Sequence, residues 1–197
     1  GGHASFSPRD DNEILVLQHA LKQFDHVSFE RLVSGPGLEL IYQALAQSQG
    51  QGDDHLSATE ITRLALDEQH SLCGTALDVF CNMLGTAASN LAVTLGATGG
   101  VYIGGSIVPR LGSYFDNSGF RQRFEDKGRF RQYVEHIPTY VITADNPTFL
   151  GVSAILEAQL RTLGNADAAR GDVDAAKFEP ARDLREALAL DLADQVV

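Results

Sequence analysis

Three short segments of this 197-residue chain carry residue types that could bind a ligand. Gly1-Gly2-His3 presents an imidazole after two flexible glycines. Glu30 is a carboxylate just ahead of the glycine turn at residues 34–37, and it could accept hydrogen bonds from ligand hydroxyls. Each segment also has a plain structural interpretation, as a frayed terminus or a solvated edge residue. When Gly1-Gly2-His3 and Glu30 are each considered alone, the structural interpretation is favoured.

The third segment runs from Gly99 to Ser106 and reads Gly-Gly-Val-Tyr-Ile-Gly-Gly-Ser. A β-branched and aromatic run between two glycine pairs predicts a short buried strand that enters a glycine turn. Glycines in such a turn let a phosphate or nucleotide approach the backbone closely. The spacing matches neither a P-loop nor the GxGxxG pattern. Tight packing of the strand against a helix is an equally open interpretation.

The charge balance excludes one class of partner. The chain has 15 basic and 26 acidic residues and a net charge of −11, whereas nucleic-acid binders need a basic surface. A local exception is residues 121–131, which hold five basic residues. We expect a solvated helix pair there, with Phe120, Phe124 and Phe130 docked on the core, and an anionic-ligand patch is the less favoured alternative. The longest uncharged stretch, residues 79–109, is too polar for a membrane span.

The cysteines and histidines show no metal-site spacing. Cys73 and Cys81 lie eight residues apart in a helical pattern, which is too far for a disulfide, so we expect buried reduced thiols in a cytosolic protein. CxxC and HExxH motifs are absent from the sequence. His26, His70 and His136 are therefore expected to be surface residues.

Short strands alternate with helices along the chain, which predicts an α/β layer protein with more helix than strand. The sequence predicts helices over residues 11–24, 38–46 and 71–95, a helix that begins at a capping box at Ser57–Glu60, and a last core helix over 147–164. It predicts strands over residues 26–33, 101–103 and 139–143. The helix over 71–95 is barely charged and should be buried on most sides. Residues 166–176 are expected to form a linker, and 182–197 a short amphipathic helix.

Several segments, in this order and spacing, resemble the bacterial glucokinases of the hexokinase-like, actin-fold superfamily. The resemblance extends over residues 1–162 and rests on six segments: 1–6, 26–38, 95–110, 124–130, 137–142 and 145–147. It implies the C-terminal portion of an actin-like (ribonuclease H-like) ATPase domain. Residues 163–197 would then be an acidic tail or linker.

The resemblance also assigns roles to residues. His3 matches the histidine of the family's Glu-Gly-Gly-His sugar loop, whose glutamate would precede Gly1, and Glu30 matches a second sugar-binding carboxylate. The glycines of the family's adenosine motif are matched by Gly99, Gly100, Gly104 and Gly105. Ser106 follows them, at a position where the family often has a further glycine. The implied activity is ATP- and Mg²⁺-dependent phosphorylation of the glucose 6-hydroxyl in the cytoplasm.

Other parts of the family pattern are absent from this sequence. The general base and both phosphate loops belong to the family's N-terminal domain, so no catalytic residue is expected in this chain, and the chain alone should be inactive. A non-catalytic sugar-sensing or regulatory module, fused to or derived from a glucokinase, is the alternative. A dimerisation scaffold is a third interpretation, and a homodimer is left open. Nucleic acid and membrane are not expected as partners.

Overall fold

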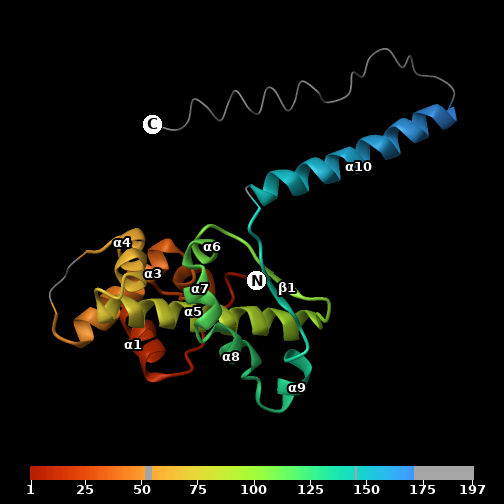
Figure 1. Cartoon of the computed structure of the whole chain (residues 1–197). Helices are drawn as coiled ribbons and strands as arrows, with labels where there is room; N and C mark the ends of the chain where they lie inside the picture. Colours follow the sequence, from red (N-terminus) through yellow and green to blue (C-terminus); the bar gives the residue numbers. More distant parts are fainter. Residues whose placement is uncertain (52–54, 145, 171–197) are drawn as a thin grey trace, which may run out of the picture. The chain divides into compact units, whose positions relative to one another are not determined.

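A computed structural model describes residues 1–51, 55–144 and 146–170, with side chains up to residue 162 (Figure 1). The chain divides into two compact units, Gly1–Ala144 and Asp145–Val197. The described part of the second unit is helix α10 (Pro147–Arg170). The prediction of a helix beginning at Pro147 is confirmed, and that it is a core helix stays a prediction. The expected linker begins inside this helix, and the expected helix over 182–197 lies outside the described residues.

The first unit is mainly helical. Its helices are α1 (Asp11–Ala20), α2 (Phe29–Leu32), α3 (Gly35–Ser48), α4 (Ala58–Leu66), α5 (Ser71–Leu95), α6 (Ile107–Leu111), α7 (Ser113–Asn117), α8 (Phe120–Glu125), the 3₁₀ turn η1 (Gly128–Phe130) and α9 (Arg131–Val134). The predicted capping box at Ser57 is present. Asp10 and Ser34 also cap their helices, and each of the three side chains accepts a hydrogen bond from a backbone N–H of the first turn.

Helix α5 forms the centre of this unit, with α3, α4 and α8 packed against it (Figure 1). Phe80 and Met83 are fully enclosed, and Cys73 and Cys81 are free and buried, as expected. Burial raises the pKa of the Cys81 thiol to about 12, so the thiol stays protonated and unreactive at neutral pH. By length and composition alone α5 could cross a membrane, but most of its apolar window is buried inside the protein. The helix therefore serves as the core of the unit.

Two short parallel strands, β1 (Val101–Ile103) and β2 (Thr139–Val141), form the sheet that the structure describes. Val101 pairs with Thr139, and Ile103 with Val141. Ile103 is buried against the helices, while Tyr102 points to the opposite face and stacks on Tyr140 with ring centroids 5.1 Å apart. Both tyrosine rings are exposed. The expected α/β class, with more helix than strand, is confirmed.

The predicted strand over residues 26–33 is wrong. Only an isolated antiparallel bridge joins Ser28 to Ser5, and the chain then enters α2. The physical reason is the side chain of Ser28, which accepts a hydrogen bond from the Arg31 N–H at 3.2 Å and so caps the helix. Local capping has thus overridden the β-like run of residue types.

Two smaller expectations are also wrong. Phe130 is 48% exposed, whereas Phe120 and Phe124 are buried as expected. His70 is half-buried at the start of α5 and its ring lies edge-on to Tyr42, so it is not a surface histidine. His26 and His136 are exposed as predicted.

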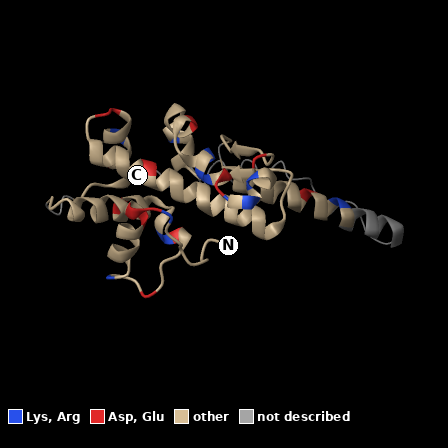
Figure 2. Ribbon diagram, turned by 90° about the horizontal axis from the view of Figure 1, so that it is seen from below, with Lys and Arg blue, Asp and Glu red and all other residues tan. Residues whose placement is uncertain are grey.

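Three arginines of the basic segment pair with acidic neighbours, and Figure 2 shows basic residues of the described helices beside acidic ones. Arg121 pairs with Glu125 at 2.7 Å and donates to the backbone carbonyls of Glu135 and Ile137. Arg123 pairs with Asp10 at 2.6 Å and with the buried Glu13 at 2.9 Å. These contacts favour a structural role for the segment over an anionic-ligand patch.

Candidate functional site

The first predicted site lies where the N-terminal residues run antiparallel to residues 26–30, a pairing that we call the N-terminal clasp (residues 1–6 and 26–30). Three backbone hydrogen bonds hold it, from Glu30 N–H to the Gly2 carbonyl, from Phe29 N–H to the Ala4 carbonyl and from Phe6 N–H to the Val27 carbonyl. The buried rings of Phe6 and Phe29 meet edge to face, with centroids 5.4 Å apart. The clasp therefore fixes the backbone on both sides of His3 and Glu30.

His3 and Glu30 come together in this clasp. His3 Nδ1 lies 2.8 Å from Glu30 Oε2, and the side chains are 82% and 61% exposed. Glu30 stands in the first turn of α2, and not at the end of a strand as expected from the sequence. The pair presents a carboxylate acceptor and an imidazole to solvent from one place, which is an arrangement that can bind the adjacent hydroxyls of a sugar.

The structure gives a reason for a glycine at residue 2, where the sequence alone indicated only a flexible backbone. A Cβ atom at Gly2 would lie 2.8 Å from Glu30 Oε2 and 3.3 Å from Glu30 Cβ. The missing side chain at residue 2 thus leaves room for the carboxylate beside His3. Ser28 was also missed, although Ser28 followed by the acidic Glu30 two residues later is a helix-start signal.

The second predicted site is the glycine loop (residues 99–106), with β1 at its centre. Gly100 and Gly105 have φ angles of +131° and +108°, a region that residues with side chains rarely adopt. A Cβ at Gly100 would approach the Tyr140 ring to 3.1 Å, so this glycine is also required by packing. Over Gly99 and Gly105 there is open space. The loop can therefore serve packing at Gly100 and close approach of a ligand at Gly99 and Gly105.

Ser106 precedes α6 without capping it through its side chain. Helix α5 leads into the glycine loop, and a Cβ at Gly1 would lie 3.5 Å from Leu91 in the same helix. The N-terminal clasp and the glycine loop are thus both attached to the C-terminal half of α5. No hydrogen bond or ion pair within residues 1–51 and 55–144 joins one site directly to the other.

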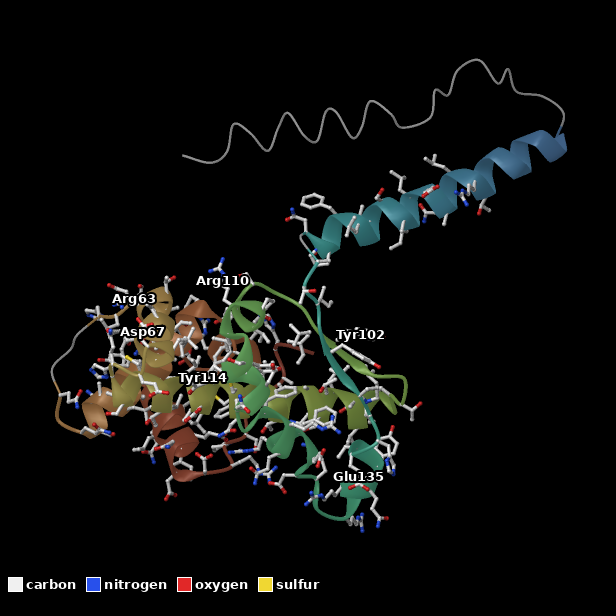
Figure 3. All side chains as sticks on the ribbon, in the orientation of Figure 1. Arg63, Asp67, Tyr102, Arg110, Tyr114 and Glu135 are labelled. Carbon is white, nitrogen blue, oxygen red and sulfur yellow. The ribbon has the colours of Figure 1, made fainter. Side chains whose placement is uncertain are left out.

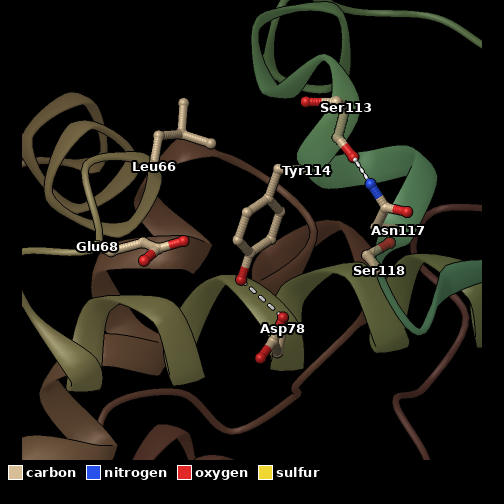
Figure 4. A pocket seen from close by; sticks show the side chains of 7 residues that line it. All are labelled: Leu66, Glu68, Asp78, Ser113, Tyr114, Asn117 and Ser118. Atoms are coloured by element: carbon tan, nitrogen blue, oxygen red, sulfur yellow. Dashed lines mark hydrogen bonds between the residues drawn. The ribbon is translucent and has the colours of Figure 1, made fainter.

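An open pocket of about 440 Å³ lies elsewhere, between α4, α5 and α7 (Figure 4). Tyr114 donates hydrogen bonds to Asp78 Oδ1 at 2.7 Å and to the Gly74 carbonyl at 3.2 Å. Burial, and then the Asp78 carboxylate, raise the pKa of the Tyr114 hydroxyl well above its usual range. This hydroxyl is therefore a fixed structural donor and not a proton-transfer group at neutral pH.

Solved structures place this architecture in the class of actin-like ATPase folds. A crystal structure of glucokinase from an Antarctic psychrotroph superimposes with a TM-score of 0.74 at 39% identity, and the match covers 80% of this chain and 49% of that one. A glucokinase from Balamuthia mandrillaris, solved in complex with glucose, matches with a TM-score of 0.64 at 21% identity and supports the fold alone. The expected fold class is confirmed.

The family follows from the sequence comparisons. Residues 1–159 match the family model described as Glucokinase, so the chain belongs to the glucokinase family. A glucokinase from Neisseria meningitidis serogroup C is 51% identical over 83% of this chain and 50% of its own length. A "Bifunctional protein glk" from Paraburkholderia xenovorans is 51% identical over 95% of this chain and 28% of its own length. The chain thus spans half or less of these relatives.

Proposed function

We propose that this chain supplies the C-terminal large-domain portion of an ATP-dependent glucokinase, within residues 1–162. The whole enzyme would transfer the γ-phosphoryl group of ATP to the 6-hydroxyl of glucose in the cytoplasm. The observation that carries the proposal is the His3–Glu30 pair at 2.8 Å, in a chain that belongs to the glucokinase family.

Glucose would bind at the N-terminal clasp. Vicinal sugar hydroxyls donate well to a carboxylate, and Glu30 offers two acceptor oxygens that His3 orients. A site that holds its ligand through such hydrogen bonds also rejects sugars that lack the hydroxyl, because its polar groups are then left unpaired.

The adenosine part of ATP would bind at the glycine loop, through Gly99, Gly100, Gly104, Gly105 and Ser106. The open space over Gly99 and Gly105 and the left-handed backbone at Gly105 support close approach of a ligand to the main chain. The serine at residue 106 is exposed and free to contact the ligand.

We propose no Mg²⁺ site within the described residues. They contain no group of three or more His, Cys, Asp and Glu side chains that could hold a metal ion. We assign the base that accepts the proton of the sugar hydroxyl, and the two phosphate loops, to the N-terminal half of the enzyme. The present chain would bind and orient sugar and nucleoside, and phosphoryl transfer requires both halves.

An activity measurement with a chimera tests this proposal. The chain matches half of the length of the Neisseria meningitidis glucokinase. In the chimera, residues 1–162 replace that matched half and are joined to the N-terminal half of the Neisseria enzyme. We expect glucose- and ATP-dependent formation of glucose 6-phosphate by the chimera, and none by the 197-residue chain alone. A well-folded but inactive chimera would contradict the proposed function, and normal turnover by the chain alone would contradict the division of roles.

Glu30→Gln in the same chimera tests the sugar site. The change keeps the shape of the side chain but removes the charge that strengthens hydrogen bonds from sugar hydroxyls, so we expect the KM for glucose to rise roughly tenfold or more. The KM for ATP should not change. Glu39→Gln serves as the matched control, because Glu39 accepts a hydrogen bond from Ala58 N–H, outside the clasp.

A sugar-responsive regulatory module is the second candidate. One observation favours it, since the match to the bifunctional relative covers 95% of this chain while the match to the Neisseria glucokinase covers 83%. Calorimetric titration of the chain with glucose separates the two candidates when it is combined with the chimera assay. Glucose binding that Glu30→Gln abolishes, together with an inactive chimera, would favour the regulatory module.

A further inference from the structure

Arg110 differs from the other basic residues that the structure describes. Each of the others has a partner, either a carboxylate, as for Arg63 with Asp67, an amide, as for Lys127 with Asn90, or an aromatic ring, as for Arg31 over Phe24. Arg110 has no such partner among the described residues, although the chain has 26 acidic residues against 15 basic ones. No described residue therefore occupies its guanidinium, which is available to an anionic ligand.

The position of Arg110 is fixed by α6. Val108 and Leu111, three residues apart on this helix, are buried, so Arg110 is on the outward side and is exposed. Arg110 follows Ser106 by four residues, about one helical turn or 6 Å along the axis, and the two share one side of the helix. Arg110 lies in the last turn of α6, and Figure 3 shows its side chain directed away from the neighbouring helices.

The direction of the side chain favours contact with a ligand of the glycine loop. In a helix each Cα–Cβ bond is tilted toward the N-terminus, so a long side chain at residue 110 leans back toward residue 106 and the turn before it. The backbone at Gly104 and Gly105 is exposed there, and over Gly105 there is open space. A ligand lying on the loop would thus extend toward an unpaired positive charge.

We propose that Arg110 binds a phosphate group of the nucleotide held by the glycine loop. The guanidinium offers paired N–H donors that match phosphate oxygens, and it stays charged at any physiological pH. This inference rests on the proposed function, because it takes the nucleotide to bind at the glycine loop. Arg110 would be a binding residue for the phosphate chain, while the loop accommodates the nucleoside.

The test compares ligands with and without phosphates, and the chimera described above is used to measure the KM values. Arg110→Ala should raise the KM for ATP roughly tenfold, as expected for loss of a charge-assisted hydrogen bond, and leave the KM for glucose unchanged. By calorimetry, the affinity for ADP should fall by a similar factor while the affinity for adenosine stays the same. Arg110→Lys, which retains the charge but not the fork of donors, should restore part of the affinity for ADP.

Arg63→Ala is the matched control. It also removes one exposed arginine and its charge, but from α4, and it should leave the affinities for ADP and adenosine unchanged. Unchanged ADP affinity in Arg110→Ala would overturn the inference, as would an equal loss for adenosine and ADP or an equal effect of Arg63→Ala. If instead the wild-type protein binds ADP but does not phosphorylate glucose, the proposed function fails and the inference about Arg110 stands.

Discussion

The N-terminal clasp and the glycine loop are built in different ways. The clasp is held by backbone hydrogen bonds and by a buried pair of phenylalanine rings. The residues that follow its first segment, Arg9 and Asp10, form ion pairs with Asp126 and Arg123. The glycine loop depends on two three-residue strands and on glycines with positive φ angles, and its tyrosine pair is exposed. The N-terminal clasp is thus stabilised by backbone hydrogen bonds and side-chain contacts, and the glycine loop mainly by its backbone conformation.

This difference indicates where each region is sensitive. Loss of a buried side-chain contact should affect the clasp and the helices that hold it, whereas an added methyl group should affect the glycine loop. The following variants separate the two kinds of support, beginning with the largest expected effect.

Arg123→Ala should be the most destabilising. Arg123 Nη1 lies 2.9 Å from Glu13 Oε1, both atoms are buried, and neither has a hydrogen-bond partner, so the ion pair is their only compensation. Removing one partner leaves a buried charge, which costs about 3–5 kcal/mol of the free energy of unfolding. Urea denaturation measures this loss. Arg63→Ala, which breaks an exposed pair with Asp67, should cost no more than about 0.5 kcal/mol, and equal losses in both variants would contradict the buried role of Arg123.

Gly105→Ala and Gly104→Ala test the glycine loop. At Gly105 the φ of +108° strains any residue with a Cβ, at about 1–3 kcal/mol in the free energy of unfolding. Gly104 lies outside the left-handed region, and a Cβ there would be in ordinary contact with Ile142 at 3.7 Å, so stability should change little. If a nucleotide approaches this backbone, Gly104→Ala should still raise the KM for ATP. An unchanged KM for ATP would contradict close approach of the nucleotide to the backbone at Gly104.

The pH dependence of the free energy of unfolding should reveal the titration of the buried Glu13 carboxyl. Burial raises the pKa of this carboxyl above 4.5, so between pH 4.5 and that higher value the folded protein binds more protons than the unfolded chain. The free energy of unfolding should therefore fall as pH rises through this window. Glu13→Gln removes the titrating group, and its stability curve should lose this part of the slope. Parallel curves for the two proteins, measured by urea denaturation at several pH values, would contradict the raised pKa.

Much of the fold could be predicted because its signals are local. The apolar spacing of residues 71–95 predicted α5 with the observed bounds, and the capping box at Ser57 marked the start of α4. The prediction of a strand over residues 26–33 was wrong because the β-branched and aromatic residues there have no partner strand, and the cap from Ser28 starts a helix instead.

The candidate site was predictable in its residues but not in its geometry. The sequence pointed to His3 and Glu30, yet these residues are 27 positions apart, and nothing local indicated that they would meet at 2.8 Å. The contact depends on antiparallel backbone pairing within the clasp, which is a tertiary feature. Arg110 went unnoticed for the same reason, because its lack of a partner among the described residues is visible only once the positions of their acidic side chains are known.

Gly2→Ala gives the smallest expected change in stability and the sharpest test of how the clasp works. A Cβ at residue 2 would lie 2.8 Å from Glu30 Oε2, and the exposed carboxylate can move aside at little cost, so the free energy of unfolding should change by less than about 0.5 kcal/mol. The displaced carboxylate would no longer lie beside His3, and the KM for glucose should rise severalfold while the KM for ATP stays the same. Gly1→Ala is the matched control, since its Cβ would make only an ordinary contact with Leu91. An unchanged KM for glucose in Gly2→Ala would show that the position of the Glu30 carboxylate beside His3 is not what binds the sugar.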